Sequence, residues 1–142
     1  MASFVKFQPF VENLAEKAFN LGSDTLKVAL TNTAPVNTQG VFDPGTNHPP
    51  PAAANGYTSG GNSVTISSSS QSSGTYKLVL ADTTFTASGG SIGPFRYVIL
   101  YDDTASNGEL IGYWDYGSSI TLLTSETLTV DFDASAGVLT IA

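Results

Sequence analysis

The residues of this chain that could carry catalysis are few and widely spaced. A nucleophile–base–acid arrangement needs a base beside a serine or threonine, and the chain has one histidine, His48. His48 lies in a proline-rich stretch, where we interpret it as a loop residue and not a catalyst, and we expect His48→Ala to leave particle assembly and infectivity unchanged. The chain has no cysteine, which excludes a thiolate nucleophile, a disulfide framework and a zinc–sulfur site.

The glycine-rich segment 89–93 does not fit a nucleotide-binding loop. It precedes a segment with strand character, whereas a phosphate-binding loop opens a helix. The chain contains neither a Gly-x-Ser-x-Gly elbow nor a glycine loop that ends in Lys-Ser or Lys-Thr. We therefore expect a protein that is not an enzyme, with no catalytic residue and no cofactor.

Acidic side chains near the ends of predicted strands are the remaining candidates for chemistry. Asp102-Asp103, Asp115 and Asp131-x-Asp133 could supply the paired carboxylates of a glycoside hydrolase or oxygen ligands for calcium. A chain with 12 acidic residues produces such pairs by chance, and it has no Asp-x-Asp-x-Asp-Gly loop. We expect neither hydrolysis nor a metal site, and the question of a bound cation stays open.

Two groups of residues suit contact with another protein. An aromatic cluster flanks Asp115, and tyrosine and tryptophan are enriched at binding hot spots, although packing in the core explains such residues as well. A run of three prolines favours a stiff, extended chain, which loses little disorder when it docks. The candidate partner-binding residues are Pro49, Pro50, Pro51, Tyr113, Trp114 and Tyr116.

The composition describes one domain with an acidic, charge-poor surface. The chain has 142 residues, and 12% of them are charged, against about 25% in a typical soluble domain. The net charge is −7, and no lysine or arginine follows Arg96. Such a surface repels phosphate, so direct binding of nucleic acid is not expected. Neither a signal peptide nor a membrane-spanning segment is predicted, which indicates a cytoplasm-like setting.

One helix is predicted, over residues 9–21. Phe10, Leu14 and Ala18 recur at helical spacing and form an apolar stripe, which we expect to pack against a sheet. Gly22 follows at a position that suits the end of a helix.

After this helix the apolar residues alternate with a period of two. The pattern predicts an all-β fold, a single β-sandwich domain over residues 1–142 for which a jelly roll is one possible form. The segment Phe95–Tyr101 is apolar on both faces and is predicted to be a central strand, and 67–73 is predicted to be a polar loop or edge. The strands are expected near 26–31, 64–66, 76–80, 83–87, 95–101, 110–116, 119–123, 126–133 and 138–142.

Residues 34–56 form a proline-rich arm. Prolines cannot donate backbone hydrogen bonds, so this stretch cannot hold a regular ladder of them. Two interpretations stay open, an ordered arm laid over a neighbouring molecule and a mobile surface loop. In both cases we expect the arm to matter more for binding than for folding.

Several strings of this sequence resemble small virion proteins of tailed bacteriophages. They are Asp24–Pro35, Leu78–Tyr97, Leu110–Ser119 and Thr129–Asp133, together with the opening helix, and they cover nearly all of the chain outside the arm. The proteins in question are similar to the head decoration, or capsid cement, proteins.

This resemblance implies a non-enzymatic protein that decorates the capsid and stabilises it. Its partner would be the lattice of the major capsid protein, it would form a homo-oligomer (a dimer or trimer), and it would contact neither nucleic acid nor membrane. It would be made in the host cytoplasm and lie on the outer surface of the phage head. Two alternatives stay open, a carbohydrate- or receptor-binding β-module of a phage tail and a tail-tube or head–tail joining protein.

Overall fold

A computed structural model describes residues 2–142 and confirms an all-β fold with one short helix, α1 (Pro9–Ala15). Every strand pair in this part of the chain is antiparallel. The strands are β1 (Phe4–Lys6), β2 (Leu26–Thr31), β3 (Asn62–Val64), β4 (Ile66–Ser72), β5 (Thr75–Leu80), β6 (Thr83–Thr86), β7 (Ile92–Asp102), β8 (Leu110–Leu122), β9 (Thr127–Val130) and β10 (Leu139–Ile141).

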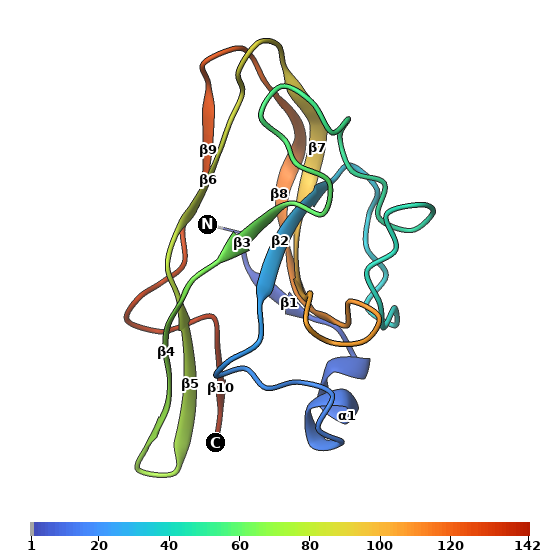
Figure 1. Cartoon of the computed structure of the whole chain (residues 1–142). Coiled ribbons are helices and arrows are strands. Elements are labelled where there is room, and N and C mark those ends of the chain that lie inside the picture. The colour runs from blue at the N-terminus through green and yellow to red at the C-terminus, as the bar shows by residue number, and fades with distance from the viewer. Residues whose placement is uncertain (1) are drawn as a thin grey trace.

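The largest sheet has five strands in the order β1-β8-β7-β2-β3. The prediction that the segment around 95–101 is a central strand is confirmed, because β7 lies between β8 and β2 and is buried on both faces. Its apolar residues on both faces suit that position, since each face is covered by other parts of the protein. Figure 1 shows this sheet as the curved centre of the molecule.

Two smaller sheets cover one face of the five-stranded sheet. They have the orders β10-β5-β4 and β6-β9. In Figure 1 they lie one above the other on the same side of the molecule. The main hydrophobic core lies between the sheets and draws fully buried side chains from both sides, among them Leu30 and Leu100 from one and Leu78 and Phe85 from the other.

The helix is shorter than predicted, because it ends at Ala15 and not near residue 21. Lys17 takes the left-handed conformation with φ of 67°, and the backbone N–H of Ala18 donates to the carbonyl of Asn13 at 2.8 Å. This is the pattern of a Schellman motif, which closes a helix end. A lysine therefore fills the capping position that we had assigned to Gly22. Phe10 of the predicted stripe is buried against the main core.

Two strand predictions need correction, those for β8 and β1. β8 is one continuous strand where two were predicted, because Gly117, with φ of 97°, takes up an irregularity inside the strand. The serine-rich segment 67–73, predicted to be a polar loop or edge, belongs mostly to β4, and β4 is the edge strand of its sheet, so the edge alternative is confirmed. β1 was not predicted, since three residues are too few for a periodic signal.

The proline-rich arm packs on its own molecule, against the face of the large sheet that the small sheets leave free (Figure 1). The buried residues there include Ile99, Tyr101 and Leu110, with Phe42 of the arm packed against them. Irregular backbone bonds hold the arm in place: Leu110 N–H donates to Gly40 at 2.9 Å, for example. The arm is thus an ordered segment held on its own sheet and not a mobile loop, and contact of its outer face with a neighbouring molecule stays a prediction.

Candidate partner-binding groove

A row of apolar side chains crosses the large sheet and forms the floor of a groove. Trp114 on β8 pairs in register with Phe4 on β1 and with Val98 on β7, so the three side chains stand on the same face. The rings of Phe4 and Trp114 lie 5.1 Å apart. Gly112 makes this packing possible, because a Cβ there would lie 2.1 Å from the Phe4 ring. We call this site the Trp114 groove.

The walls of the Trp114 groove come from the chain around β9 and the turn that precedes β10. Phe132 is buried there, with its ring 5.6 Å from that of Trp114. The groove encloses about 390 Å³ and is mostly apolar. Leu128, Val130 and Val138 are further apolar residues of these walls.

Among residues 2–142, the one basic side chain that lines the groove is Arg96, and a neighbouring carboxylate neutralises it. Arg96 donates two hydrogen bonds, of 2.7 and 2.8 Å, to the carboxylate of Asp115 in a bidentate geometry. The hydrogen bonds from Arg96, together with one from the backbone of Gly117, hold the pKa of Asp115 below its usual value. Both side chains are more than one-third exposed, so this pair orders the rim more than it stabilises the fold.

Two further carboxylates, Asp131 and Asp133, lie in the wall of the groove. Both are exposed, and within residues 2–142 neither forms an ion pair. The backbone N–H groups of Ala136 and Ser135 donate to Asp133, which lowers the pKa of that carboxyl. The rim of the groove is thus acidic around an apolar floor.

The structure separates the three predicted aromatic residues. Trp114 and Tyr116 both line the Trp114 groove, and Tyr116 is the more exposed, at 57%. Tyr113 points to the opposite face of β8, where its ring lies 5.2 Å from that of Phe7 under the arm. Neighbouring residues on a strand face opposite ways, so the aromatic cluster serves two different surfaces.

The three prolines are divided in a similar way. Pro51 is buried and Pro50 is half-buried, while Pro49 is exposed. The carbonyl of Pro49 accepts a hydrogen bond of 2.9 Å from the hydroxyl of Thr31 at the end of β2. The proline run is thus tied to the sheet, and only Pro49 offers its ring freely to a partner.

His48 lies in a loop, as predicted, and is fully buried there. Its ring stacks on that of Phe42 at 5.7 Å and lies edge-on to Phe7. Its Nδ1 accepts a hydrogen bond of 3.1 Å from the backbone N–H of Asp43, and its Nε2 lies 3.0 Å from Oε1 of Gln39. Burial lowers the pKa of His48, and the charge of Asp43 opposes this effect. Within residues 2–142, the ring's hydrogen-bond partners are Asp43 and Gln39, both of the arm, so these contacts hold the arm together.

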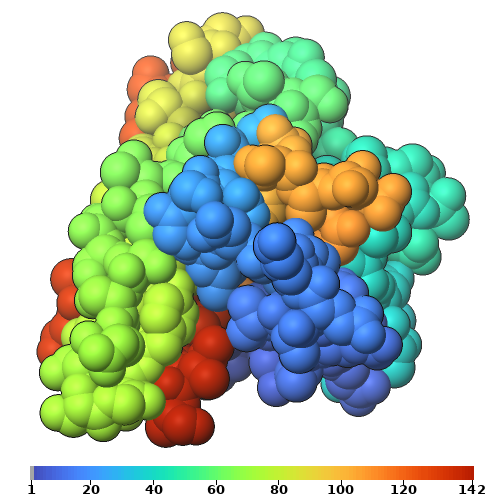
Figure 2. Space-filling model, turned by 60° about the horizontal axis from the view of Figure 1, so that its bottom comes forward, coloured from blue at the N-terminus to red at the C-terminus, as the bar shows by residue number. Residues whose placement is uncertain are grey.

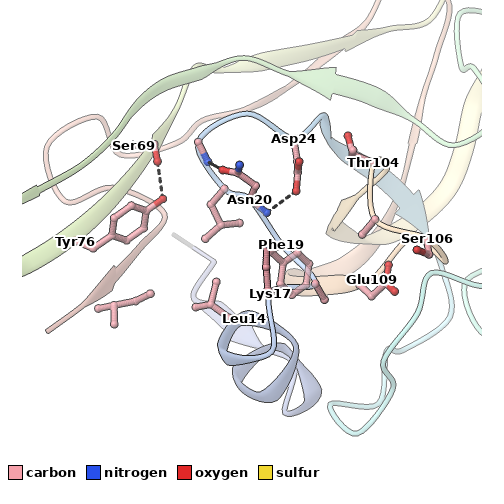
Figure 3. Close-up of a pocket in the computed structure, with 15 residues that line it drawn as sticks. Leu14, Lys17, Phe19, Asn20, Asp24, Ser69, Tyr76, Thr104, Ser106 and Glu109 are labelled. Atoms are coloured by element: carbon pink, nitrogen blue, oxygen red, sulfur yellow. Dashed lines mark hydrogen bonds between the residues drawn. The ribbon is translucent and has the colours of Figure 1, made fainter.

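A second hollow, of about 740 Å³, lies beside α1. Figure 2 looks at this end of the molecule, with α1 in dark blue and the β4–β5 hairpin in yellow-green on opposite sides. Figure 3 shows its mixed lining, in which Leu14 and Phe19 lie near polar groups such as Asp24 and Glu109. The hydroxyls of Ser69 and Tyr76 are bonded at 2.8 Å across one wall.

A buried acid lies behind this hollow. Asp102 is inaccessible to solvent, and its Oδ1 accepts hydrogen bonds from the N–H groups of Thr104 and Ala105. Its Oδ2 has no partner among the described residues. Burial and the nearby carboxyl of Asp24 raise the pKa of Asp102 to about 6. Among residues 2–142, no group of three or more histidine, aspartate and glutamate side chains is arranged to hold a metal ion.

Sequence reasoning missed the residues that give the groove its shape. Phe4 and Phe132 build the packing around Trp114, and neither belonged to the predicted set. The alternation of Leu128, Val130 and Phe132 did carry a signal, since it placed all three on one face. The alternation could not reveal that this face packs opposite Trp114.

The fold and the site define an all-β protein with an apolar groove edged by carboxylates. In comparisons with known proteins, no family model, no curated protein and no solved structure matches the chain. None of the helices within residues 2–142 has the length and apolar character needed to cross a membrane.

Proposed function

We propose that this protein is a non-enzymatic virion component that decorates a phage head and stabilises it by binding the lattice of the major capsid protein. The observation that supports this most is the Trp114 groove, an apolar surface hollow on a rigid all-β scaffold. Exposed apolar surface that is concentrated in one place is typical of protein–protein contact. The resemblance of its sequence strings to head decoration proteins agrees with this function.

In this proposal the layered sheets form a β-sandwich, with a jelly roll as its more specific form. The protein lies on the outer surface of the head as a dimer or trimer and is made in the host cytoplasm. It spans joints between capsid subunits, so that its contacts must break before the subunits separate. Each contact can be modest, because many copies act together.

The charge-poor surface supports a binding role. With only 12% charged residues, most of the outside is Ser, Thr, Asn and Gly, which cost little to desolvate compared with ions. The acidic groups at the groove then act mainly on the rate of encounter and on specificity, while the apolar floor slows dissociation.

The test is to strip the protein from capsids, re-add it in purified form over a salt series and count the copies per particle. We expect specific rebinding that survives roughly physiological salt, where charges are screened over about 8 Å. The variant Trp114→Ala should occupy fewer sites than the wild type. No specific rebinding at any salt would remove the decoration function.

One observation favours a second function, a carbohydrate-binding module of a phage tail. The exposed ring of Tyr116 lies in the same groove as Trp114, beside the polar pair of Arg96 and Asp115. Aromatic rings with polar neighbours are a common platform for sugars. Binding of purified protein to a panel of bacterial surface glycans, lost in Tyr116→Ala, would favour this function over decoration.

A further inference from the structure

We infer that the Trp114 groove binds an extended segment of a partner protein in which large apolar side chains stand between lysines or arginines. This inference rests on the proposed function and adds the chemistry of the partner to it. It is carried by two independent features of the groove, its apolar floor and the carboxylates of Asp131 and Asp133, which form no ion pair within residues 2–142.

The floor calls for an apolar ligand. Phe4, Val98 and Trp114 are only partly buried, although they pack against the main core. At about 390 Å³ the groove is within the range of roughly 300–1,000 Å³ that is typical of binding pockets. Covering such a floor with apolar side chains removes it from water, which is the main driving force of association.

The rim calls for a cation. Arg96 is already held by Asp115 in a bidentate pair, so it cannot balance further negative charge. Asp131 and Asp133 remain without an ion pair within residues 2–142. The charge of Lys77 helps to lower the pKa of Asp133, but Nζ of Lys77 donates its hydrogen bond to the carbonyl of Ser135 at 2.9 Å and not to a carboxylate. A lysine or arginine of a partner would meet an attractive field here.

The same charges argue against the other occupants. A second copy of this chain brings a net charge of −7 to a rim that is already acidic. An acidic peptide would place its carboxylates against Asp131 and Asp133. An uncharged glycan would engage neither of these carboxylates as an ion.

Trp114 makes the test direct, because it is the only tryptophan of the chain and lies in the floor of the groove. Three end-blocked hexapeptides are titrated into the intact protein: Lys-Lys-Leu-Phe-Lys-Lys, its twin with glutamate for lysine, and its twin with serine for the two apolar residues. We expect the first peptide to shift the emission of Trp114 to shorter wavelength, with saturation. The other two should bind at least about tenfold more weakly.

Matched variants test whether the carboxylates of Asp131 and Asp133 cause the peptide binding that the emission of Trp114 reports. The double variant Asp131→Asn and Asp133→Asn should weaken binding of the basic peptide about tenfold, and Asp131→Asn alone should weaken it less. Asparagine keeps an oxygen that can accept the backbone hydrogen bonds made by Asp133. The control is Glu12→Gln with Glu16→Gln, two exposed acids near α1 whose loss should leave binding unchanged.

Four outcomes would overturn the inference. They are equal binding of the basic and acidic peptides, no shift with any peptide, a shift with oligosaccharides alone, and a shift that grows with protein concentration when no peptide is present. The last would assign the groove to a second copy. Capsid rebinding is measured separately, so a protein that occupies capsids yet ignores all three peptides refutes this inference and leaves the proposed function standing.

Discussion

The imidazole of His48 accepts a hydrogen bond from the backbone N–H of Asp43, 3.1 Å away, and so closes the turn at the tip of the proline-rich arm. Accepting at Nδ1 requires the neutral ring, with its proton on Nε2, where it donates to Gln39. The single histidine of this chain thus holds the arm on the sheet as a buried, neutral group.

Replacing His48 should therefore destabilise the protein. His48→Ala loses two hydrogen bonds and leaves a cavity beside Phe7 and Phe42, which should lower the free energy of unfolding by about 2–4 kcal/mol. Urea unfolding at neutral pH measures this. Thr46→Ala, an exposed change in the same turn, is the control and should alter stability by less than about 0.5 kcal/mol. Equal stability of the two variants would contradict the role of His48.

The lowered pKa of His48 also makes stability depend on pH. The folded state favours the neutral ring. The stability that the buried, neutral His48 contributes is therefore fully present above the unfolded pKa of 6.5 and is lost as the pH falls below it. Melting temperatures between pH 5 and 8 should show this loss in the wild type. In His48→Ala the loss of melting temperature toward low pH should be smaller. A variant with the same pH profile as the wild type would show that His48 is not the group responsible.

Asp102 should act in the opposite direction. Its pKa is raised in the folded state, which favours the protonated carboxyl. The stability that this preference contributes is fully present below the unfolded pKa of 3.8 and is lost as the pH rises toward about 6. Asp102→Asn keeps an acceptor for Thr104 and Ala105 and removes the buried charge, so it should raise the melting temperature at pH 7. The control is Asp103→Asn, which removes the exposed pair with Lys27 and should not raise it. A lower melting temperature of Asp102→Asn at pH 7 would show that the charge is compensated.

Lys17 is a site where a glycine should stabilise the fold. Its φ of 67° lies in the left-handed region, which glycine adopts without a steric penalty. Lys17→Gly should raise the free energy of unfolding by a few tenths to about 1 kcal/mol. Ala15→Gly, inside the last helical turn, should lower it by a similar amount. If both changes destabilise the protein, the side chain of Lys17 makes contacts that outweigh the backbone strain.

Tyr113 and Trp114 should differ when each is replaced by alanine. Tyr113→Ala removes packing under the arm and should lower stability by about 3 kcal/mol, with capsid occupancy reduced only as far as folding is impaired. Trp114→Ala should reduce occupancy under conditions in which the variant is still folded. Thermal melting and copy counts on the same preparations separate the two effects, and equal losses of occupancy would contradict the assignment of separate faces.

Local pattern was sufficient to predict most of the strands. The alternation in 26–31, 76–80 and 95–101 arises from the period of two along a strand, which every short segment carries in its own residues. The same holds for the start of α1, where Pro9 suits the first helical turn. The end of the helix was mispredicted, because the left-handed cap falls on a lysine and not on a glycine.

The sequence by itself determined an all-β chain with a central β7, an apolar face on β9 and an acidic second half that contains the only tryptophan. The tertiary structure alone decided that β1 pairs with β8, that Phe132 faces Trp114, and that the arm covers Tyr113 and buries His48. The physical reason is that alternation tells which residues share a face of a strand. What covers that face depends on contacts between segments far apart in the chain, which no local pattern records.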